Sequence, residues 1–270
     1  MKQRRHDWLF SKPLARVTMG RWLAAFILAV AMMRPAAGAE LRVLCPNALR
    51  TPVLEAARAF VRGSGHKLDF EFASVGAIHK RVASGDAVDV AIGTAQGIDA
   101  LLRLGRAMEG TEAPIARSVL ALALRQGDPR VNPADVQALT LALRAASSLV
   151  YPDAGLGAPG GGQAAELLDR LGMTAEVKEK SRLVADSREV AKRVASGAAQ
   201  LGIAHMNDIV GTPGVVAVGP LDEPATASLV YTAVAVQRSA KTDAARAWIA
   251  FLTSREAKAA IRSAGYAPAN

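Results

Sequence analysis

The sequence is poor in the residues from which disulfide frameworks and metal centres are built. It contains a single cysteine, Cys45, which cannot form an internal disulfide. The four histidines are scattered: His6, His66, His79 and His205. None of them stands in the short-range clusters that hold metal ions. We therefore expect no metal and no cofactor, and we interpret Cys45, which follows apolar residues, as a buried and inert thiol.

Motifs for catalysis are also absent. The chain has no G-x-S-x-G elbow, no H-E-x-x-H helix and no phosphate-binding loop of the P-loop type. Carboxylates are plentiful, but no two of them form a distinctive pair. The sequence predicts that the protein is not an enzyme and names no catalytic residue.

No hydrophobic run is long enough to cross a membrane. The longest continuous one near the N-terminus is Trp22–Met33, twelve residues, whereas a spanning helix needs about 20. It follows a basic segment and precedes a small-residue site ending at Ala39, the order typical of a secretory signal peptide. We predict that residues 1–39 are a cleavable signal and that Glu40 starts the mature chain. Met1 and Met19 both remain possible translation starts.

An excess of positive charge is confined mainly to that signal. The whole chain has 33 Lys and Arg against 24 Asp and Glu, and residues 1–39 hold seven and one of these, which leaves 26 against 23. A nucleic-acid-binding protein needs a basic patch and a recognisable binding motif, and the sequence offers neither. We expect no nucleic-acid partner.

Aromatic residues are few, at 4%, while apolar stretches alternate between strand-like and helix-like patterns. This alternation predicts an α/β fold with mixed, mostly parallel sheets and flanking helices. Expected strands include 41–44, 67–72, 88–92, 119–124, 201–204 and 229–236. Expected helices include 51–62, 75–84, 96–104, 163–171, 188–196, 243–252 and 255–263.

The chain is predicted to form two lobes. Two long apolar strands, 119–124 and 229–236, are placed as passages between them, which gives lobe I at 40–121 and 232–270 and lobe II at 122–231. The hexapeptide Lys80–Gly85 recurs letter for letter as Lys192–Gly197. Each copy follows a serine and precedes an apolar strand, so we interpret the repeat as a sign of two similar lobes.

Several loops place backbone N–H groups at expected helix starts, where unpaired donors and partial positive charge favour an anion. In an α/β sheet such loops lie at the carboxyl ends of the strands, where ligands bind. The predicted ligand-binding residues are Asn47, Ala48, Ser74, Val75, Gly76, Thr94, Gly160, Gly161, Ser187 and His205. For Ser74 and Ser187 a simple helix-capping role is the alternative. The glycine-rich loop is alternatively a connector, and His205 a capping or solvent-facing residue.

These segments resemble the periplasmic molybdate-binding proteins of ABC transporters and their relatives. The likeness rests on the opening strand 41–44, the serine loop 72–78 and the strand 89–92. It continues in the strand 201–204 and the closing stretch 245–256. It covers nearly all of the chain beyond the signal.

The resemblance implies a two-lobed type II periplasmic-binding fold, a monomer in the periplasm and an ABC permease partner in the inner membrane. In that family, serine hydroxyls and backbone N–H groups hold a tetrahedral oxyanion, and Ser74 matches one such serine. Two positions depart from the pattern, since Ala48 replaces a serine beside Asn47 and His205 replaces a tyrosine. A small oxyanion such as molybdate or tungstate is the expected ligand. A small organic acid or other anion is the alternative, and an exported enzyme a further one.

Overall fold

The computed structural model describes residues 38–156, 160–221 and 229–269, and these contain two five-stranded sheets. The first sheet has the order β2-β1-β3-β10-β4. Its strands are β1 Glu40–Pro46, β2 Lys67–Ala73, β3 Val90–Thr94, β4 Ala113–Ser118 and β10 Leu229–Ala235. Strand β1 runs parallel to β2 and β3, whereas β10 runs antiparallel to β3 and β4.

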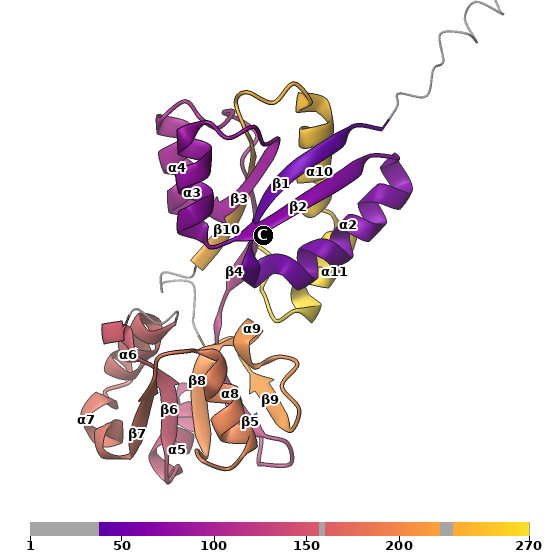
Figure 1. Ribbon diagram of the computed structural model, residues 1–270. Helices are drawn as coiled ribbons and strands as arrows, with labels where there is room; N and C mark the ends of the chain where they lie inside the picture. The colour runs from indigo at the N-terminus through magenta and orange to yellow at the C-terminus, as the bar shows by residue number, and fades with distance from the viewer. Residues whose placement is uncertain (1–37, 157–159, 222–228, 270) are drawn as a thin grey trace, which may run out of the picture. The chain divides into compact units, whose positions relative to one another are not determined.

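Helices cover both faces of this sheet (Figure 1). Alternate residues of β1 point to opposite faces, as a strand requires. Val43 and Cys45 pack with α2 Arg50–Ser64, α10 Thr242–Leu252 and α11 Arg255–Ser263 around the buried Trp248. Leu44 packs with α3 Val75–Ser84 and α4 Ala95–Arg103 on the other face. The expected buried Cys45 thiol is confirmed, and burial raises its pKa well above the usual range.

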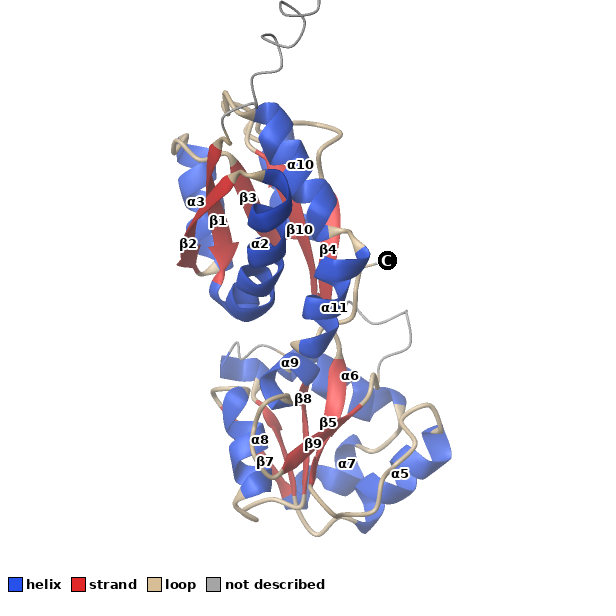
Figure 2. Ribbon diagram, turned by 90° about the vertical axis from the view of Figure 1, so that its right-hand side faces the viewer, coloured by secondary structure: helices blue, strands red, loops and turns tan. Residues whose placement is uncertain are grey.

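The second sheet has the order β7-β6-β8-β5-β9. Its strands are β5 Leu120–Arg125, β6 Leu149–Pro152, β7 Ser181–Val184, β8 Leu201–His205 and β9 Val215–Val218. The helices on one face are α5 Val136–Ala145, α6 Gly161–Arg170 and α7 Thr174–Val177. The other face carries α8 Arg188–Ala195 and the short α9 Met206–Ile209 (Figure 2).

The two sheets repeat one topology. In each, the second strand in the order, β1 or β6, pairs in parallel with both neighbours. The third strand, β3 or β8, then begins two antiparallel pairings, β3-β10-β4 in the first sheet and β8-β5-β9 in the second. The repeated hexapeptide occupies matching places in this plan. It ends α3 and α8, and its glycines Gly85 and Gly197 take positive φ of 91° and 80°. Strands β3 and β8 follow them.

The chain leaves the first sheet at Ser118, the last residue of β4, and enters the second sheet at Leu120, the first residue of β5. It returns before Leu229, where β10 begins, through a segment that includes residues 222–228, which lie outside the described residues. The predicted lobe limits at 121/122 and 231/232 are a few residues from these sheet limits. The sheets are also linked where Gly265, after α11, packs on Asn207 of α9.

Most expected elements are present with small shifts at their ends, and α3 and α11 begin and end at the expected residues. The expected helix 51–62 begins one residue earlier, at Arg50, because a single 3-10 turn, Asn47–Leu49, leads directly into α2, so Thr51 lies inside the helix and does not cap it. The predicted signal peptide lies outside the described residues except for Gly38 and Ala39. Within the described residues, no helix combines the length and apolar character needed to cross a membrane.

Candidate functional site

A cleft of about 640 Å³ opens between the two sheets. It is lined at the strand ends of the first sheet by Pro46, Asn47, Ala48, Ala73, Ser74, Val75, Thr94, Ser118, Leu229 and Tyr231. From the second sheet come Ala185, Asp186, Ser187, Arg188, His205, Asn207 and Asp208. The carboxyl ends of β1, β2 and β3 therefore face the ends of β7 and β8, where α/β sheets bind ligands.

The first-sheet wall presents hydroxyl groups at two helix starts. Ser74 Oγ accepts the N–H of Ala77 at 3.3 Å, and Thr94 Oγ1 accepts the N–H of Gly97 at 3.1 Å. Each hydroxyl thus caps its helix as an acceptor, and its hydrogen remains available to a ligand. The N–H of Val75, in the first turn of α3, has no intrahelical partner. This wall is rich in donors.

Asn47 and Ala48 stand beside that wall on the turn after β1. Both are exposed, and the Asn47 amide has no hydrogen-bond partner in the described part of the chain. The turn is tied down from behind, because Tyr266 Oη donates to the Ala48 carbonyl oxygen at 2.7 Å. Burial raises the pKa of the Tyr266 phenol, so the donor stays protonated. Asn47 is therefore free to turn its amide toward a ligand.

On the second-sheet wall, Ser187 does not cap its helix. Its hydroxyl donates instead to Asp208 Oδ2 at 2.7 Å, although Ser187 precedes α8 as Ser74 precedes α3. The N–H of Arg188 donates to Asp186 Oδ1 at 3.0 Å, and its guanidinium also pairs with Asp186. The Arg188 side-chain hydrogen bonds lower the pKa of Asp186, which stays ionised. A carboxylate of the protein itself therefore occupies the start of α8.

His205 ends β8 and is 3% exposed. Its Nε2 hydrogen-bonds to Gln163 Oε1 of α6. Gly160 approaches the same ring, since a Cβ at that position would lie 3.4 Å from it, and its φ is 80°. A Cβ at Gly161 would lie 2.7 Å from the Ala154 nitrogen. Close packing therefore accounts for glycine at both positions, and neither residue lines the cleft.

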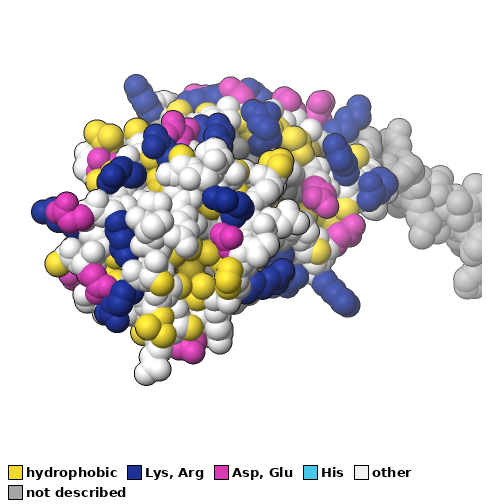
Figure 3. Space-filling model, turned by 90° about the horizontal axis from the view of Figure 1, so that it is seen from below, with side chains coloured by type: hydrophobic (Ala, Val, Ile, Leu, Met, Phe, Trp, Pro, Cys, Tyr) yellow, Lys and Arg dark blue, Asp and Glu magenta, His cyan; other side chains and the backbone are white. Residues whose placement is uncertain are grey.

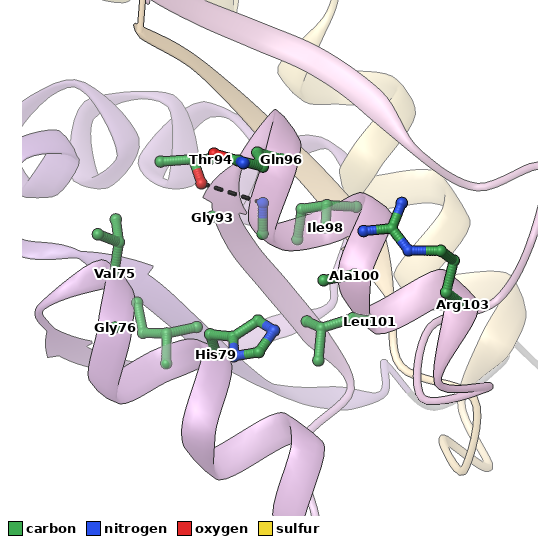
Figure 4. A pocket seen from close by; sticks show the side chains of 12 residues that line it. Val75, Gly76, His79, Gly93, Thr94, Gln96, Ile98, Ala100, Leu101 and Arg103 are labelled. Carbon is green, nitrogen blue, oxygen red and sulfur yellow. Dashed lines mark hydrogen bonds between the residues drawn. The ribbon is translucent and has the colours of Figure 1, made fainter.

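Gly76 belongs to a separate groove of about 400 Å³ between α3 and α4 (Figure 4). Val75 and Thr94 line both hollows. The groove has an apolar floor that includes Ile98 and Leu101. His79 points between the two helices, and its buried Nε2 has no hydrogen-bond partner among the residues that the structure describes.

Sequence reasoning missed six polar residues of the cleft: Ser118, Asp186, Arg188, Asn207, Asp208 and Tyr231. Ser118 Oγ donates to Asn207 Oδ1 at 3.1 Å, and Asn207 Nδ2 donates to Asp208 Oδ1 at 3.0 Å. Burial raises the pKa of the Tyr231 phenol to about 12. In the sequence, only their position could have indicated a role in the cleft, because each of these residues lies at or near a strand end.

Neither a metal centre nor a polyelectrolyte surface stands out. In the part of the chain that the structure describes, no three His, Cys, Asp or Glu side chains gather closely enough to hold a metal ion. Lys and Arg are intermixed with Asp and Glu on the face shown in Figure 3.

Comparison with known proteins agrees with this geometry. Residues 41–267 match the family model described as bacterial extracellular solute-binding protein. Aconitate isomerase of Pseudomonas sp is 29% identical over 233 residues, which cover 84% of this chain and 87% of that protein.

Two solved structures have the same arrangement of elements. The substrate-binding domain of a putative molybdenum ABC transporter from Clostridium difficile superposes with a TM-score of 0.79 at 20% identity, over 86% of this chain and 100% of that one. The periplasmic molybdate-binding protein of Azotobacter vinelandii gives 0.58 at 22% identity, over 84% and 98%. These likenesses confirm the α/β fold of type II periplasmic-binding proteins, and the match over residues 41–267 places the chain in the family of bacterial extracellular solute-binding proteins.

Proposed function

We propose that this protein captures a small organic anion bearing carboxylate groups in the cleft and delivers it to an ABC permease. The observation that supports an anion is the first-sheet wall. There, the hydroxyls of Ser74 and Thr94 and the N–H of Val75 at the start of α3 offer donors that have no acceptor in the described part of the chain. Partial positive charge at helix starts adds to their attraction for an anion.

Two features favour an organic anion over the molybdate expected from resemblance. A cleft of about 640 Å³ has the size of sites that take small organic molecules. The curated relative named for a carboxylic acid is 29% identical, whereas the two molybdenum-related structures are 20% and 22% identical. Molybdate and tungstate remain the competing ligands in the test.

Two observations support export of the protein to the periplasm. The family is extracellular, and β1 begins at Glu40, the predicted first residue after cleavage. We propose that residues 1–39 direct the chain to the periplasm, where it acts as a monomer. Mass spectrometry of the exported protein should give a mature N-terminus at Glu40, and light scattering a single chain.

The test of the anion site is the substitution Ser74→Asp. Aspartate caps helices as well as serine does, so we expect α3 to remain folded. The added negative charge faces the ligand anion, and we expect the dissociation constant for a bound carboxylate to rise more than tenfold. Isothermal titration with citrate, tricarballylate, malate, molybdate and tungstate measures this.

Ser84→Asp is the matched control, because Ser84 lies at the other end of α3 and its hydroxyl donates only to Lys80 O. It adds the same charge away from the cleft and should leave affinity unchanged. Equal loss of affinity in both variants, or binding of molybdate and tungstate alone, would contradict the proposal.

A second candidate is isomerisation of an unsaturated polycarboxylate such as aconitate. The named relative suggests it, and Asp208 places a carboxylate inside the cleft. The reaction removes a proton from the CH2 beside the double bond and returns one to the far alkene carbon, so no atom is gained or lost. Asp208 is the base that the geometry offers.

Proton NMR of cis-aconitate incubated with the purified protein tests this candidate. Conversion to the trans isomer that disappears in Asp208→Asn supports it. Binding of aconitate without conversion to the trans isomer contradicts isomerisation and supports only the receptor function.

A further inference from the structure

Asp208 is an unusual group to find in a cleft for anions. It is half-buried and lines the cleft, and no cation pairs with it among the described residues. The nearby Arg188 guanidinium is bound to Asp186 instead, through Nε at 3.1 Å and Nη2 at 2.9 Å. The charge of Arg188 also acts on Asp208 without forming an ion pair with it. An anion without hydrogen-bond donors would meet the unpaired carboxylate directly, which is costly in a partly buried site.

The hydrogen bonds around Asp208 have one direction. An ionised carboxylate only accepts, so Asn207 must turn its Nδ2 toward Asp208, and its Oδ1 then accepts from Ser118. From Ser118 through Asn207 to Asp208, both shared hydrogens therefore point toward the carboxylate.

The same holds for Ser187, whose hydroxyl hydrogen also goes to Asp208. Each carboxylate oxygen has one internal donor and retains a lone pair for a ligand. The second-sheet side of the cleft therefore presents acceptors, whereas Ser74 and Thr94 on the first-sheet side present donors. A ligand that satisfies both sides needs an anionic group at one end and a donor at the other.

We infer that the ligand is a carboxylate that also carries a hydroxyl or ammonium group, and that this group donates to Asp208 when the anionic end meets Ser74. The inference rests on the proposed function and narrows its ligand class. It disfavours a fully deprotonated oxyanion and a plain polycarboxylate, because neither offers a hydrogen to Asp208.

Matched pairs of ligands test this inference with the full chain as purified. By calorimetry we would compare the affinity of the protein for malate and aspartate with that for succinate, and its affinity for citrate with that for tricarballylate. Within each pair the carboxylates are the same in number, and the members differ by the donor, which is a neutral hydroxyl in malate and citrate and a charged ammonium group in aspartate. A hydrogen bond to a charged group corresponds to about tenfold or more in affinity, so we expect that preference for the donor-bearing member of at least one pair.

The variant Asp208→Asn should reduce this preference to less than about threefold, while the affinity for the plain member changes little or rises because a negative charge is lost. Asp69→Asn, on an exposed position of β2, removes the same charge elsewhere and should keep the wild-type preference. Thermal unfolding checks that both variants remain folded.

Equal binding of both members of every pair overturns the inference but leaves the proposed function intact. A preference that persists in Asp208→Asn also overturns it, since the donor must then bind elsewhere. Binding of molybdate or tungstate with no response to any carboxylate overturns the proposed function together with the inference.

Discussion

Asp89, at the start of β3, is a buried carboxylate that holds the first sheet together away from the cleft. It accepts hydrogen bonds from the Arg42 N–H at 2.8 Å, from Ser239 Oγ at 2.7 Å and from Lys241 Nζ at 3.2 Å. Burial opposes its charge, but these donors outweigh burial and hold the pKa of Asp89 below its usual value. The residue links β1 to the turn after β10.

We predict that Asp89→Ala lowers the free energy of unfolding by about 3 kcal/mol, because it leaves Lys241 and a backbone N–H without their partner. The folded-state pKa is depressed, so the contribution of Asp89 is present above the unfolded pKa of about 4 and is lost as pH falls through the folded value. Urea unfolding at pH 7 and at pH 3 measures both effects.

The variant should accordingly lose less stability than wild type between those two pH values. Asp69→Ala, on an exposed position of β2, is the control and should stay within about 0.5 kcal/mol of wild type. A variant as pH-sensitive as the wild type would contradict the role given to Asp89.

At the scale of elements, the close packing of α8 on β8 depends on Gly202. A Cβ there would lie 2.5 Å from Val190 Cγ1 and 3.2 Å from both Ala123 Cβ and Val194 Cγ2. We predict that Gly202→Ala destabilises the protein by about 1–3 kcal/mol, because the helix must move away from the sheet.

Gly63→Ala is the matched control, since Gly63 lies inside α2 with open space around its Cα. Alanine favours a helix interior over glycine by about 0.5–1 kcal/mol, so this change should stabilise the fold. Thermal unfolding of the two variants should shift in opposite directions, and shifts of the same sign would argue against the packing explanation.

Elements with strong local signals were predictable from the sequence. Helices α3 and α11 combine an apolar face with a serine that caps the first turn, and both serines make that bond in the structure. Strands β6, β7 and β9 have four residues each, too few to establish a periodic pattern. In β7 the exposed Leu183 breaks the rule that apolar residues are buried.

The candidate site was predictable where it depends on strand ends and helix starts, as at Ser74 and Thr94. It was not predictable where it depends on contacts between distant segments. Ser118 and Asn207 are 89 residues apart, and β4, which carries Ser118, has no strong strand pattern. The different hydrogen bonds of Ser74 and Ser187 likewise follow from Asp208, a neighbour that local sequence does not reveal.

At the scale of the whole molecule, the second sheet is formed by one continuous stretch of chain. All its strands lie between Leu120 and Val218, and the ends of the stretch meet where the Leu221 N–H donates to the Leu120 carbonyl oxygen at 2.9 Å. The first sheet instead needs β10, from the last part of the chain, between β3 and β4.

We predict that residues 119–221 fold alone, because their own core includes Leu122, Leu143, Leu168 and Ile203. A cooperative thermal transition and dispersed amide NMR signals from this fragment would show it. Residues 38–118 alone lack the strand that joins β3 to β4 and should show neither. A fragment 119–221 without a cooperative transition would contradict the prediction.

The central place of β10 fixes the order in which the protein is completed during synthesis. The second sheet has all its strands once residue 221 has emerged, whereas β3 and β4 lack β10, the strand that pairs with both, until Leu229–Ala235 arrives. A nascent chain stopped shortly before residue 229 would therefore hold one finished half and one open half, with β3 exposing an unpaired edge. A chaperone that protects the nascent chain is needed most during that interval. The cleft is complete, and can bind a ligand, only after β10 has paired.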